Sequence, residues 1–154
     1  MSISNFSING SSLNSTLYKG SSRHFNFLVD EPEELGGQDL AANPVEYLLA
    51  GYAGCLNVVI NLVAKELGIR IYDMTINING NIETSTFLGI DPEGRAGFQS
   101  LDVDIDFVTN ATQESIDFLL KNVKQRCPIN DNLSHTTPIH YHINKSSYKQ
   151  EVNA

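Results

Sequence analysis

The chain lacks residue types on which several common protein classes depend. Its 154 residues include no tryptophan and only two cysteines, Cys55 and Cys127. Small domains that replace a hydrophobic core with disulfides need more cysteines in a shorter chain, so a disulfide scaffold is excluded. Ten lysines and arginines, scattered along the chain, against eighteen acidic residues give a net charge of −8 at pH 7. Nucleic acid is not an expected partner, because binding its phosphates needs clustered positive charge.

The amino-terminal residues contain no basic segment followed by an apolar core. No secretory signal is therefore predicted, and a cytoplasmic location is expected. One mostly apolar run, residues 44–64, is long enough to cross a bilayer. The run contains Glu46, Asn57 and Asn61 and has no tryptophan anchor. We expect a helix in the core of a soluble protein and no membrane partner.

Hydrophobic residues make up 41% of the chain and charged residues 18%, which is typical of a globular protein. One domain over residues 1–154 is expected, with 1–16 and 145–154 as candidate flexible tails. Alternating apolar and polar residues predict strands within residues 24–29, 69–88, 98–108 and 138–143. The 69–88 segment fits one strand or two, and Asn-Gly pairs at 9–10 and 79–80 predict turns.

Two helices are expected. The first starts with Asn43 as its cap, Pro44 at its first position and Glu46 placed to complete a capping box, and it ends at Gly68. A helix so long and so apolar is expected to pack against a second subunit as well as its own sheet. The second helix covers residues 112–125, where apolar residues recur at helical spacing. The order of elements predicts an α+β domain with a mainly antiparallel sheet.

The two cysteines are the main chemical candidates. If Pro128 opens a short helix, Cys127 caps it, and unpaired backbone N–H groups favour the thiolate, with Arg126 as a nearby cation. Cys55 lies inside the long helix, so any activating group must come from elsewhere in the fold. For each cysteine the alternative is a small apolar side chain used for packing.

Other motifs give no cofactor or metal site. The acidic stripe of Asp102, Asp104 and Asp106, on the outward face of the strand expected within residues 98–108, is better explained as a solvated surface, because it fails the calcium-loop pattern. Two histidines, His140 and His142, have a spacing that can bind zinc, and His135 is a possible third ligand, but surface histidines are the simpler interpretation. No phosphate-binding glycine loop or nucleophilic serine motif is present.

The chain resembles the OsmC/Ohr family of osmotically inducible and organic-hydroperoxide-resistance proteins. The resemblance rests on NPVEYLLAGYAGC before an apolar helix, and on RCPI near the end of the second helix. It covers roughly residues 20–143. It implies an intertwined homodimer with two long central helices, and active sites at the subunit interface.

The resemblance also implies a reaction without metal, haem or other cofactor. The cysteine that matches Cys55 attacks an organic hydroperoxide and becomes a sulfenic acid, and the one that matches Cys127 resolves it as a disulfide. A dithiol, dihydrolipoyl in one branch of the family, restores the enzyme. The family's early arginine, which stabilises the thiolate, matches Arg23. The family's orienting acid follows the helix-opening proline directly, whereas here Val45 holds that position and the acid is Glu46.

The sequence thus predicts a cytoplasmic, homodimeric thiol peroxidase of organic hydroperoxides, acting in oxidative-stress defence. Two other functions are kept as alternatives: a non-catalytic dimer that binds a small apolar ligand, and a thiol redox sensor. The peroxidase and the ligand-binding dimer differ in whether oxidant links Cys55 to Cys127.

Overall fold

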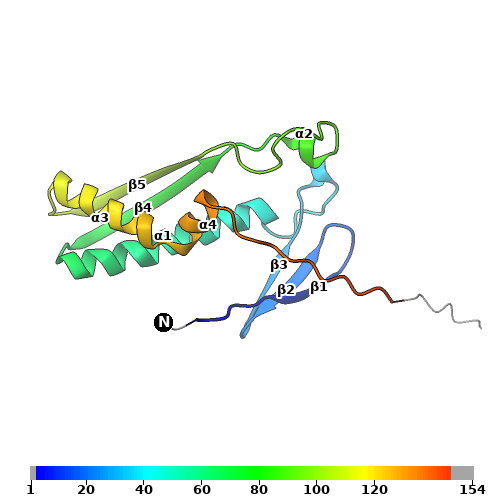
Figure 1. Ribbon diagram of the computed structural model, residues 1–154, viewed down its shortest axis with the longest axis horizontal. Coiled ribbons are helices and arrows are strands. Elements are labelled where there is room, and N and C mark those ends of the chain that lie inside the picture. The colour runs from blue at the N-terminus through cyan, green and yellow to red at the C-terminus, as the bar shows by residue number, and fades with distance from the viewer. Residues whose placement is uncertain (1–2, 147–154) are drawn as a thin grey trace, which may run out of the picture.

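The helix α1, Pro44–Leu67, is the longest helix of the computed structural model, which describes residues 3–146 (Figure 1). The Asn43 side chain accepts a hydrogen bond from the Glu46 backbone N–H at 2.9 Å, and the Glu46 carboxylate accepts one from the Asn43 N–H at 2.8 Å. Gly68, with φ 68°, ends the helix in the left-handed region that glycine favours. The expected capping box and both helix ends are confirmed.

A long antiparallel hairpin covers one side of α1. Strands β4, Ile71–Gly80, and β5, Leu101–Thr109, pair along their lengths. Every second residue of β5 from Leu101 to Phe107 faces the helices, and the aspartates between them are exposed. The hairpin therefore has one apolar face on the core and one polar face in solvent, as the alternation predicted.

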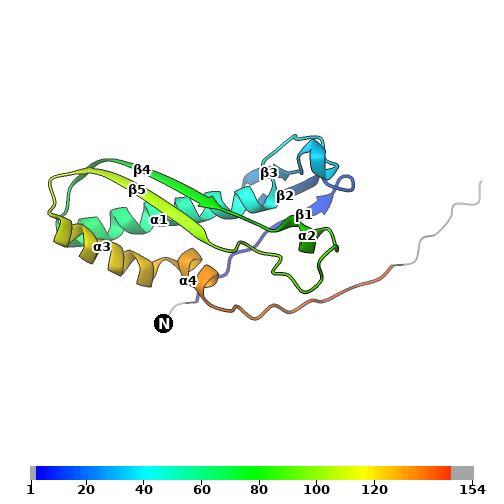
Figure 2. The ribbon, with the colours of Figure 1, turned by 90° about the horizontal axis from the view of Figure 1, so that it is seen from above.

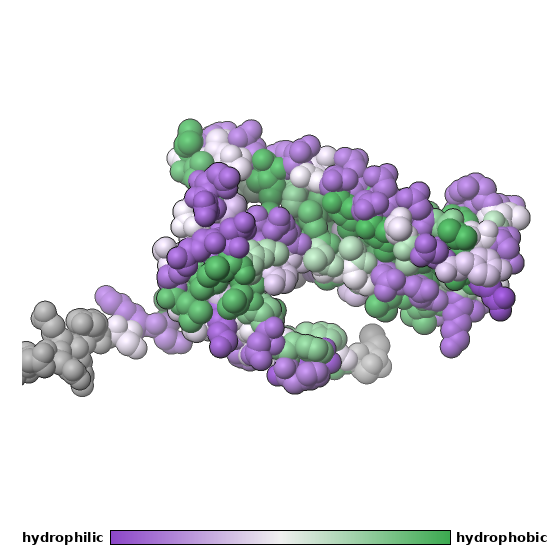
Figure 3. Space-filling view, turned by 180° about the vertical axis from the view of Figure 1, so that it is seen from behind, coloured by the Kyte–Doolittle hydropathy of each residue, from purple (hydrophilic) through white to green (hydrophobic). Residues whose placement is uncertain are grey.

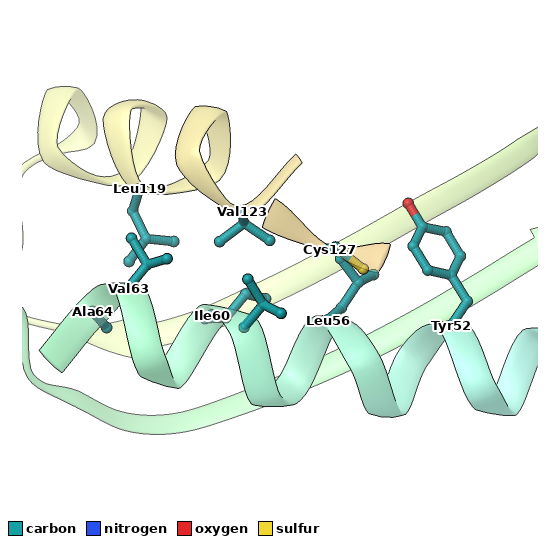
Figure 4. Packing of buried hydrophobic residues seen from close by; sticks show 9 residues of the cluster. Tyr52, Leu56, Ile60, Val63, Ala64, Leu119, Val123 and Cys127 are labelled. Atoms are coloured by element: carbon teal, nitrogen blue, oxygen red, sulfur yellow. The ribbon is translucent and has the colours of Figure 1, made fainter. Parts of the chain in front are cut away.

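Two further helices complete the core. α3, Gln113–Arg126, lies beside α1, and the short α4, Pro128–Ser134, follows it after one residue. Side chains from α3 meet side chains from α1 in a row along the contact (Figure 4). Leu119 and Ile60 are fully buried in it, and Val63 and Val123 are 1% exposed.

The three-stranded antiparallel sheet lies beyond the amino end of α1 (Figures 1 and 2). It comprises β1, Asn9–Ser12, β2, Tyr18–Ser22, and β3, Phe25–Val29. The Tyr47 hydroxyl of α1 donates a hydrogen bond to the Leu28 carbonyl at 2.8 Å and so ties the sheet to the helix. The two antiparallel sheets and the helices confirm the α+β class.

The chain between this sheet and α1 is organised by one buried carboxylate. Asp30 has no solvent-exposed surface. Its oxygens accept hydrogen bonds from the backbone N–H groups of Glu31, Gln38 and Leu40, at 2.9, 3.2 and 3.3 Å. These bonds close the loop that contains the short 3-10 helix η1, Glu33–Leu35, and leads into α1.

A second short helix, α2, Thr84–Phe87, follows β4.

The two turns expected at Asn-Gly pairs are wrong. Asn9 and Gly10 lie inside β1, and Asn79 and Gly80 end β4, which is one strand. Each glycine provides room for a neighbour: the Tyr18 ring lies where a Cβ of Gly10 would be, and Phe98 and Leu101 crowd Gly80. The β1–β2 turn forms instead where the Asn14 side chain accepts hydrogen bonds from the Thr16 and Leu17 backbone N–H groups.

The closing strand expected over residues 138–143 is also wrong. This segment leads away from α4 as extended chain without strand pairing (Figures 1 and 2). Ile139, Tyr141 and Ile143 are 71%, 83% and 90% exposed, so the apolar side of the alternating pattern is left uncovered by residues 3–146. Of the two candidate tails, residues 1–16 contain β1, and residues 147–154 lie outside the described part of the chain.

Among the described residues, α1 is the one helix long and apolar enough to span a membrane. Only 33% of its most apolar stretch is buried within the chain. The buried side chains face α3, α4 and β4, so α1 serves as the core helix of this domain. The remaining apolar face of α1, which includes Val58 and Leu62, is exposed among the described residues.

Asp30→Asn is expected to weaken the dependence of stability on acid pH. Burial acts to raise the pKa of Asp30, but hydrogen bonds from the Glu31 N–H, the Thr16 side chain and the Leu40 and Gln38 N–H groups outweigh it and lower this pKa. A lowered pKa in the folded state gives stability that is present above the unfolded pKa of 3.8 and is lost as pH falls through the folded value.

The melting temperature between pH 2 and pH 6 measures this effect. The wild type should lose more of its melting temperature on acidification than Asp30→Asn, whereas Asp102→Asn, on the exposed face of β5, should follow the wild type. Equal acid sensitivity of Asp30→Asn and the wild type would contradict the role given to Asp30.

Candidate active site

The fold brings the two cysteines into contact. Their Sγ atoms lie 3.0 Å apart, although 72 residues separate them in the sequence. Both are free thiols, and a disulfide would require closure to about 2.0 Å. Cys55 comes from the middle of α1, and Cys127 packs beside Leu56 of the same helix (Figure 4). The two sulfurs are therefore placed to form a reversible disulfide.

Cys127 occupies the joint between α3 and α4. The residue before a proline avoids helical angles, and Cys127 has an extended backbone, with φ −80° and ψ 111°. Its own N–H still donates to the Val123 carbonyl at 2.9 Å, and its sulfur accepts a hydrogen bond from the Asn130 N–H at 3.4 Å. Cys127 thus ends one helix and caps the next, as expected from the position of Pro128.

The two thiols differ in their access to solvent. Cys127 is 1% exposed, whereas Cys55 is half-buried. Cys55 lies at the centre of a stripe along α1 that its own chain leaves open, at the alternating three- and four-residue spacing of one helix face. The other members of this stripe are Leu48, Gly51, Val58 and Leu62. A molecule from outside can therefore reach Cys55 and not Cys127.

The surroundings of Cys55 disfavour its charged form. Burial raises the pKa of Cys55, and the hydrogen bond with the Cys127 sulfur and the charge that this neighbour can carry raise it further. The Ile129 backbone N–H acts in the opposite direction, since it stabilises a thiolate. Within one chain the lowering contact is the weaker, so these surroundings favour the protonated thiol of Cys55 over the thiolate that acts as a nucleophile.

Sequence reasoning missed two residues of this site, Tyr52 and Asn130. The Tyr52 hydroxyl donates a hydrogen bond of 2.8 Å to the Asn130 side-chain oxygen, joining α1 to α4. Burial, followed by the nearby Cys127 and Cys55, raises the pKa of Tyr52 and keeps it a neutral donor. The available signal was spacing, because Tyr52 precedes Cys55 by one helical turn and Asn130 follows Cys127 by one turn.

Two cavities reach Tyr52. One, of about 490 Å³, lies between β5, α1 and α3 and is lined mainly by apolar side chains, among them Leu56, Leu101 and Val123. The other, of about 260 Å³, is lined by Phe98, Leu133, Asn130 and the Arg95 side chain among others. The thiol pair thus lies next to space suited to an apolar group.

Within one chain, Arg23 and Glu46 do not join the thiol pair. Arg23 lies in the tight turn between β2 and β3, with φ 54°, and its guanidinium is 5.0 Å from the centre of the Phe25 ring. The Glu46 carboxylate is engaged in the capping box. No ion pair between Arg23 and a carboxylate occurs among residues 3–146.

Arg126, expected as a cation beside Cys127, is turned to another partner. Its guanidinium forms a two-point ion pair with the Glu66 carboxylate near the end of α1, with one N···O distance of 2.9 Å. This hydrogen bond lowers the pKa of Glu66 and raises the pKa of Arg126. Arg126 therefore fastens α3 to α1 rather than serving the sulfur.

The histidines and the acidic stripe lie apart from the thiols. Asp106 accepts a hydrogen bond from the Thr75 hydroxyl at 3.2 Å on the outer face of the hairpin. His135 pairs with Asp131 at 3.2 Å, and His140 and His142 lie in the exposed segment after α4. Within the described residues, no cluster of three His, Cys, Asp or Glu side chains is arranged to hold a metal ion.

Solved structures with this fold come from several bacteria. An OsmC-like protein from Mycoplasma pneumoniae superposes with a TM-score of 0.74 and 20% identity, over 86% of this chain and 89% of that one. An organic hydroperoxide resistance protein OsmC from Legionella pneumophila superposes with a TM-score of 0.65 and 20% identity, over 86% of this chain and 91% of that one. An organic hydroperoxide resistance protein from Elizabethkingia anophelis superposes with a TM-score of 0.64 and 24% identity, over 88% of this chain and 91% of that one. At these identities the likeness concerns the fold.

A search of curated proteins found no match. A family model described as OsmC-like protein matches residues 36–142, which include α1, both long strands, α3 and α4. This stretch contains both cysteines and covers well over half of the chain. The chain belongs to the OsmC-like protein family, as its motifs and its fold indicated.

Proposed function

We propose that this protein is a thiol peroxidase that reduces organic hydroperoxides with Cys55 and Cys127 in the cytoplasm. The observation that carries the proposal is the 3.0 Å separation of two free sulfurs, one reachable and one buried. Two of the structures with this fold are described as organic hydroperoxide resistance proteins. The mainly apolar cavity between β5, α1 and α3 favours alkyl hydroperoxides over hydrogen peroxide as substrates.

The first step uses Cys55, because it is the thiol that a peroxide can reach. The Cys55 thiolate attacks the outer peroxide oxygen, the O–O bond breaks, and an alcohol leaves after taking up a proton. The sulfur is oxidised to sulfenic acid and the peroxide is reduced. Cys127 is shielded from this attack by the core around it.

The second step uses Cys127. Its sulfur attacks the Cys55 sulfenic acid, the S–O bond breaks, and water leaves, so that a disulfide forms. The sulfurs need to close by only about 1 Å from their present separation of 3.0 Å. A dithiol reductant such as a dihydrolipoyl group then returns both cysteines to thiols and is itself oxidised to a cyclic disulfide.

The working unit in this proposal is a homodimer. The open stripe of α1 that contains Cys55 is apolar, and a Cβ on Gly51 or Gly54 would meet no other side chain of the chain, so a second helix has room to approach. The exposed apolar residues after α4 also lack cover. The space-filling view has hydrophobic surface along the elongated body of the molecule (Figure 3). A second copy supplies a matching apolar surface without any further partner.

We assign the missing cation to Arg23 of the second copy. Cys55 needs a positive group, since its pKa is raised within its own chain. Arg23 lies at the tip of the β2–β3 hairpin, in the sheet beyond the amino end of α1, and its ion-pairing capacity is unused among the described residues. In the proposed dimer, the β2–β3 hairpin of the second copy carries Arg23 to the Cys55 thiol.

Cys55→Ser is expected to lower consumption of cumene hydroperoxide to the rate without protein, because the nucleophile is removed. Cys127→Ser should complete one turnover and then accumulate sulfenic or sulfinic acid at Cys55. Peroxide consumption with dihydrolipoamide as reductant measures the activity. In oxidised wild type, mass spectrometry should find a Cys55–Cys127 link with the loss of two hydrogens. Unchanged consumption by Cys55→Ser, or no link after oxidation, would refute the mechanism and favour non-catalytic ligand binding.

Leu62→Glu is expected to dissociate the dimer, because it places a charge in the apolar stripe. Light scattering after gel filtration should give twice the chain mass of 17.0 kDa for the wild type and the single-chain mass for the variant. Tyr72→Glu, an exposed position on β4, is the control and should remain dimeric. A wild type that elutes as one chain would exclude the dimer.

Arg23→Met is expected to raise the pKa of Cys55 and to slow its alkylation by iodoacetamide at pH 7 by about tenfold, since one pKa unit is a factor of ten in thiolate. Arg23→Lys keeps the charge and should retain part of the rate. The pH dependence of alkylation measures the pKa directly. An unchanged profile in Arg23→Met would remove Arg23 from the site.

A further inference from the structure

Two residues outside the thiol pair form a polar bridge across it. Tyr52 lies on α1 one turn before Cys55, and Asn130 lies on α4 one turn after Cys127. The Tyr52 hydroxyl donates to the Asn130 side-chain oxygen at 2.8 Å. The helices that carry the two sulfurs are thus joined by a hydrogen bond within one turn of each sulfur.

Asn130 makes two more contacts that fix the position of Cys127. Its side-chain NH₂ donates to the Lys124 carbonyl in the last turn of α3 at 3.0 Å, and its backbone N–H donates to the Cys127 sulfur at 3.4 Å. One residue therefore contacts the end of α3, the sulfur at the joint and the tyrosine of α1. These contacts span the point where Pro128 interrupts the hydrogen-bond ladder between α3 and α4.

The bridge is hidden from most of the solvent. Tyr52 is only 8% exposed, and Asn130 is half-buried beside the cavity that both residues line. A buried hydroxyl without a hydrogen-bond partner costs free energy. The Tyr52–Asn130 hydrogen bond therefore favours one arrangement of α4 on α1. That arrangement is the one in which the two sulfurs meet.

We propose that Tyr52 and Asn130 are positioning residues that hold Cys127 against Cys55 and thereby set how readily the two sulfurs pair. Disulfide formation requires narrow ranges of distance and dihedral angle, so restricting the motion of one sulfur raises its effective concentration toward the other. This role rests on the proposed function for its use in catalysis: Cys127 must displace water from the Cys55 sulfenic acid before a second peroxide oxidises Cys55 further.

Two matched variants, Tyr52→Phe and Tyr47→Phe, each remove one hydroxyl from α1. Tyr52→Phe removes the bridge and keeps the ring in the core. Tyr47→Phe, on the same helix, removes the hydroxyl that donates to the Leu28 carbonyl in the three-stranded sheet, and serves as the control. Asn130→Ala removes the bridge from its other end and leaves Tyr52 in place.

The first measurement needs no peroxide. Equilibration with reduced and oxidised glutathione gives the effective concentration of the two thiols from the fraction of Cys55–Cys127 disulfide. Tyr52→Phe is expected to lower it by about fivefold, the size of effect that one typical hydrogen bond produces. Asn130→Ala should lower it at least as much, and Tyr47→Phe should leave it unchanged.

The second measurement follows overoxidation. At a fixed excess of cumene hydroperoxide, mass spectrometry should find a larger fraction of Cys55 sulfinic acid in Tyr52→Phe and Asn130→Ala than in the wild type or Tyr47→Phe. A merely structural role would lower the melting temperature without changing either the disulfide equilibrium or this fraction.

The outcomes separate the two proposals. If Tyr52→Phe and Asn130→Ala both pair their thiols with the wild-type effective concentration, the positioning role is wrong and the peroxidase proposal stands. If the wild type itself forms no Cys55–Cys127 disulfide at any glutathione ratio, the proposed function fails and the positioning role fails with it. If Tyr52→Phe and Asn130→Ala lose disulfide pairing and gain sulfinic acid while Tyr47→Phe does not, the peroxidase proposal and the positioning role are both supported.

Discussion

The packing of the end of α3 against the middle of α1 is the contact on which the rest of the molecule depends. Leu119, Val123 and Cys127 lie in a row on one side of it, facing buried residues of α1 (Figure 4). Apolar burial stabilises this contact, and the Arg126–Glu66 pair fastens its edge. The sulfurs meet because Cys127 is a member of this core, so stability and the proposed chemistry share one set of contacts.

The same contact leaves the site incomplete in a single chain. Burial favours the neutral thiol of Cys55, while the proposed reaction needs its thiolate. The open apolar stripe on α1 passes through this same residue. In the proposed dimer, the second copy both covers this stripe and supplies the positive charge of Arg23 at Cys55.

The parts of the fold that follow from local signals could be predicted from the sequence. The bounds of α1 depend on Asn43, Glu46 and Gly68, which act within a few residues, and the cap at Cys127 depends on the adjacent Pro128. The Tyr52–Asn130 bridge could not be predicted in this way, because it joins residues 78 positions apart and depends on the packing of three helices. The 138–143 segment has a strand pattern, but pairing needs a free sheet edge, which its own chain does not bring to it.

The joint at Cys127 restricts how the length of this chain can change. One residue closes α3 and opens α4, so no loop lies between the helices to absorb an insertion. Adding one residue inside the last turns of α3 would rotate whatever follows by about 100° and advance it by about 1.5 Å. Cys127 would then swing away from α1, while the long connection between β4 and β5 could grow without moving either sulfur. A change of length is therefore better tolerated in the connection between β4 and β5 than at the joint between α3 and α4.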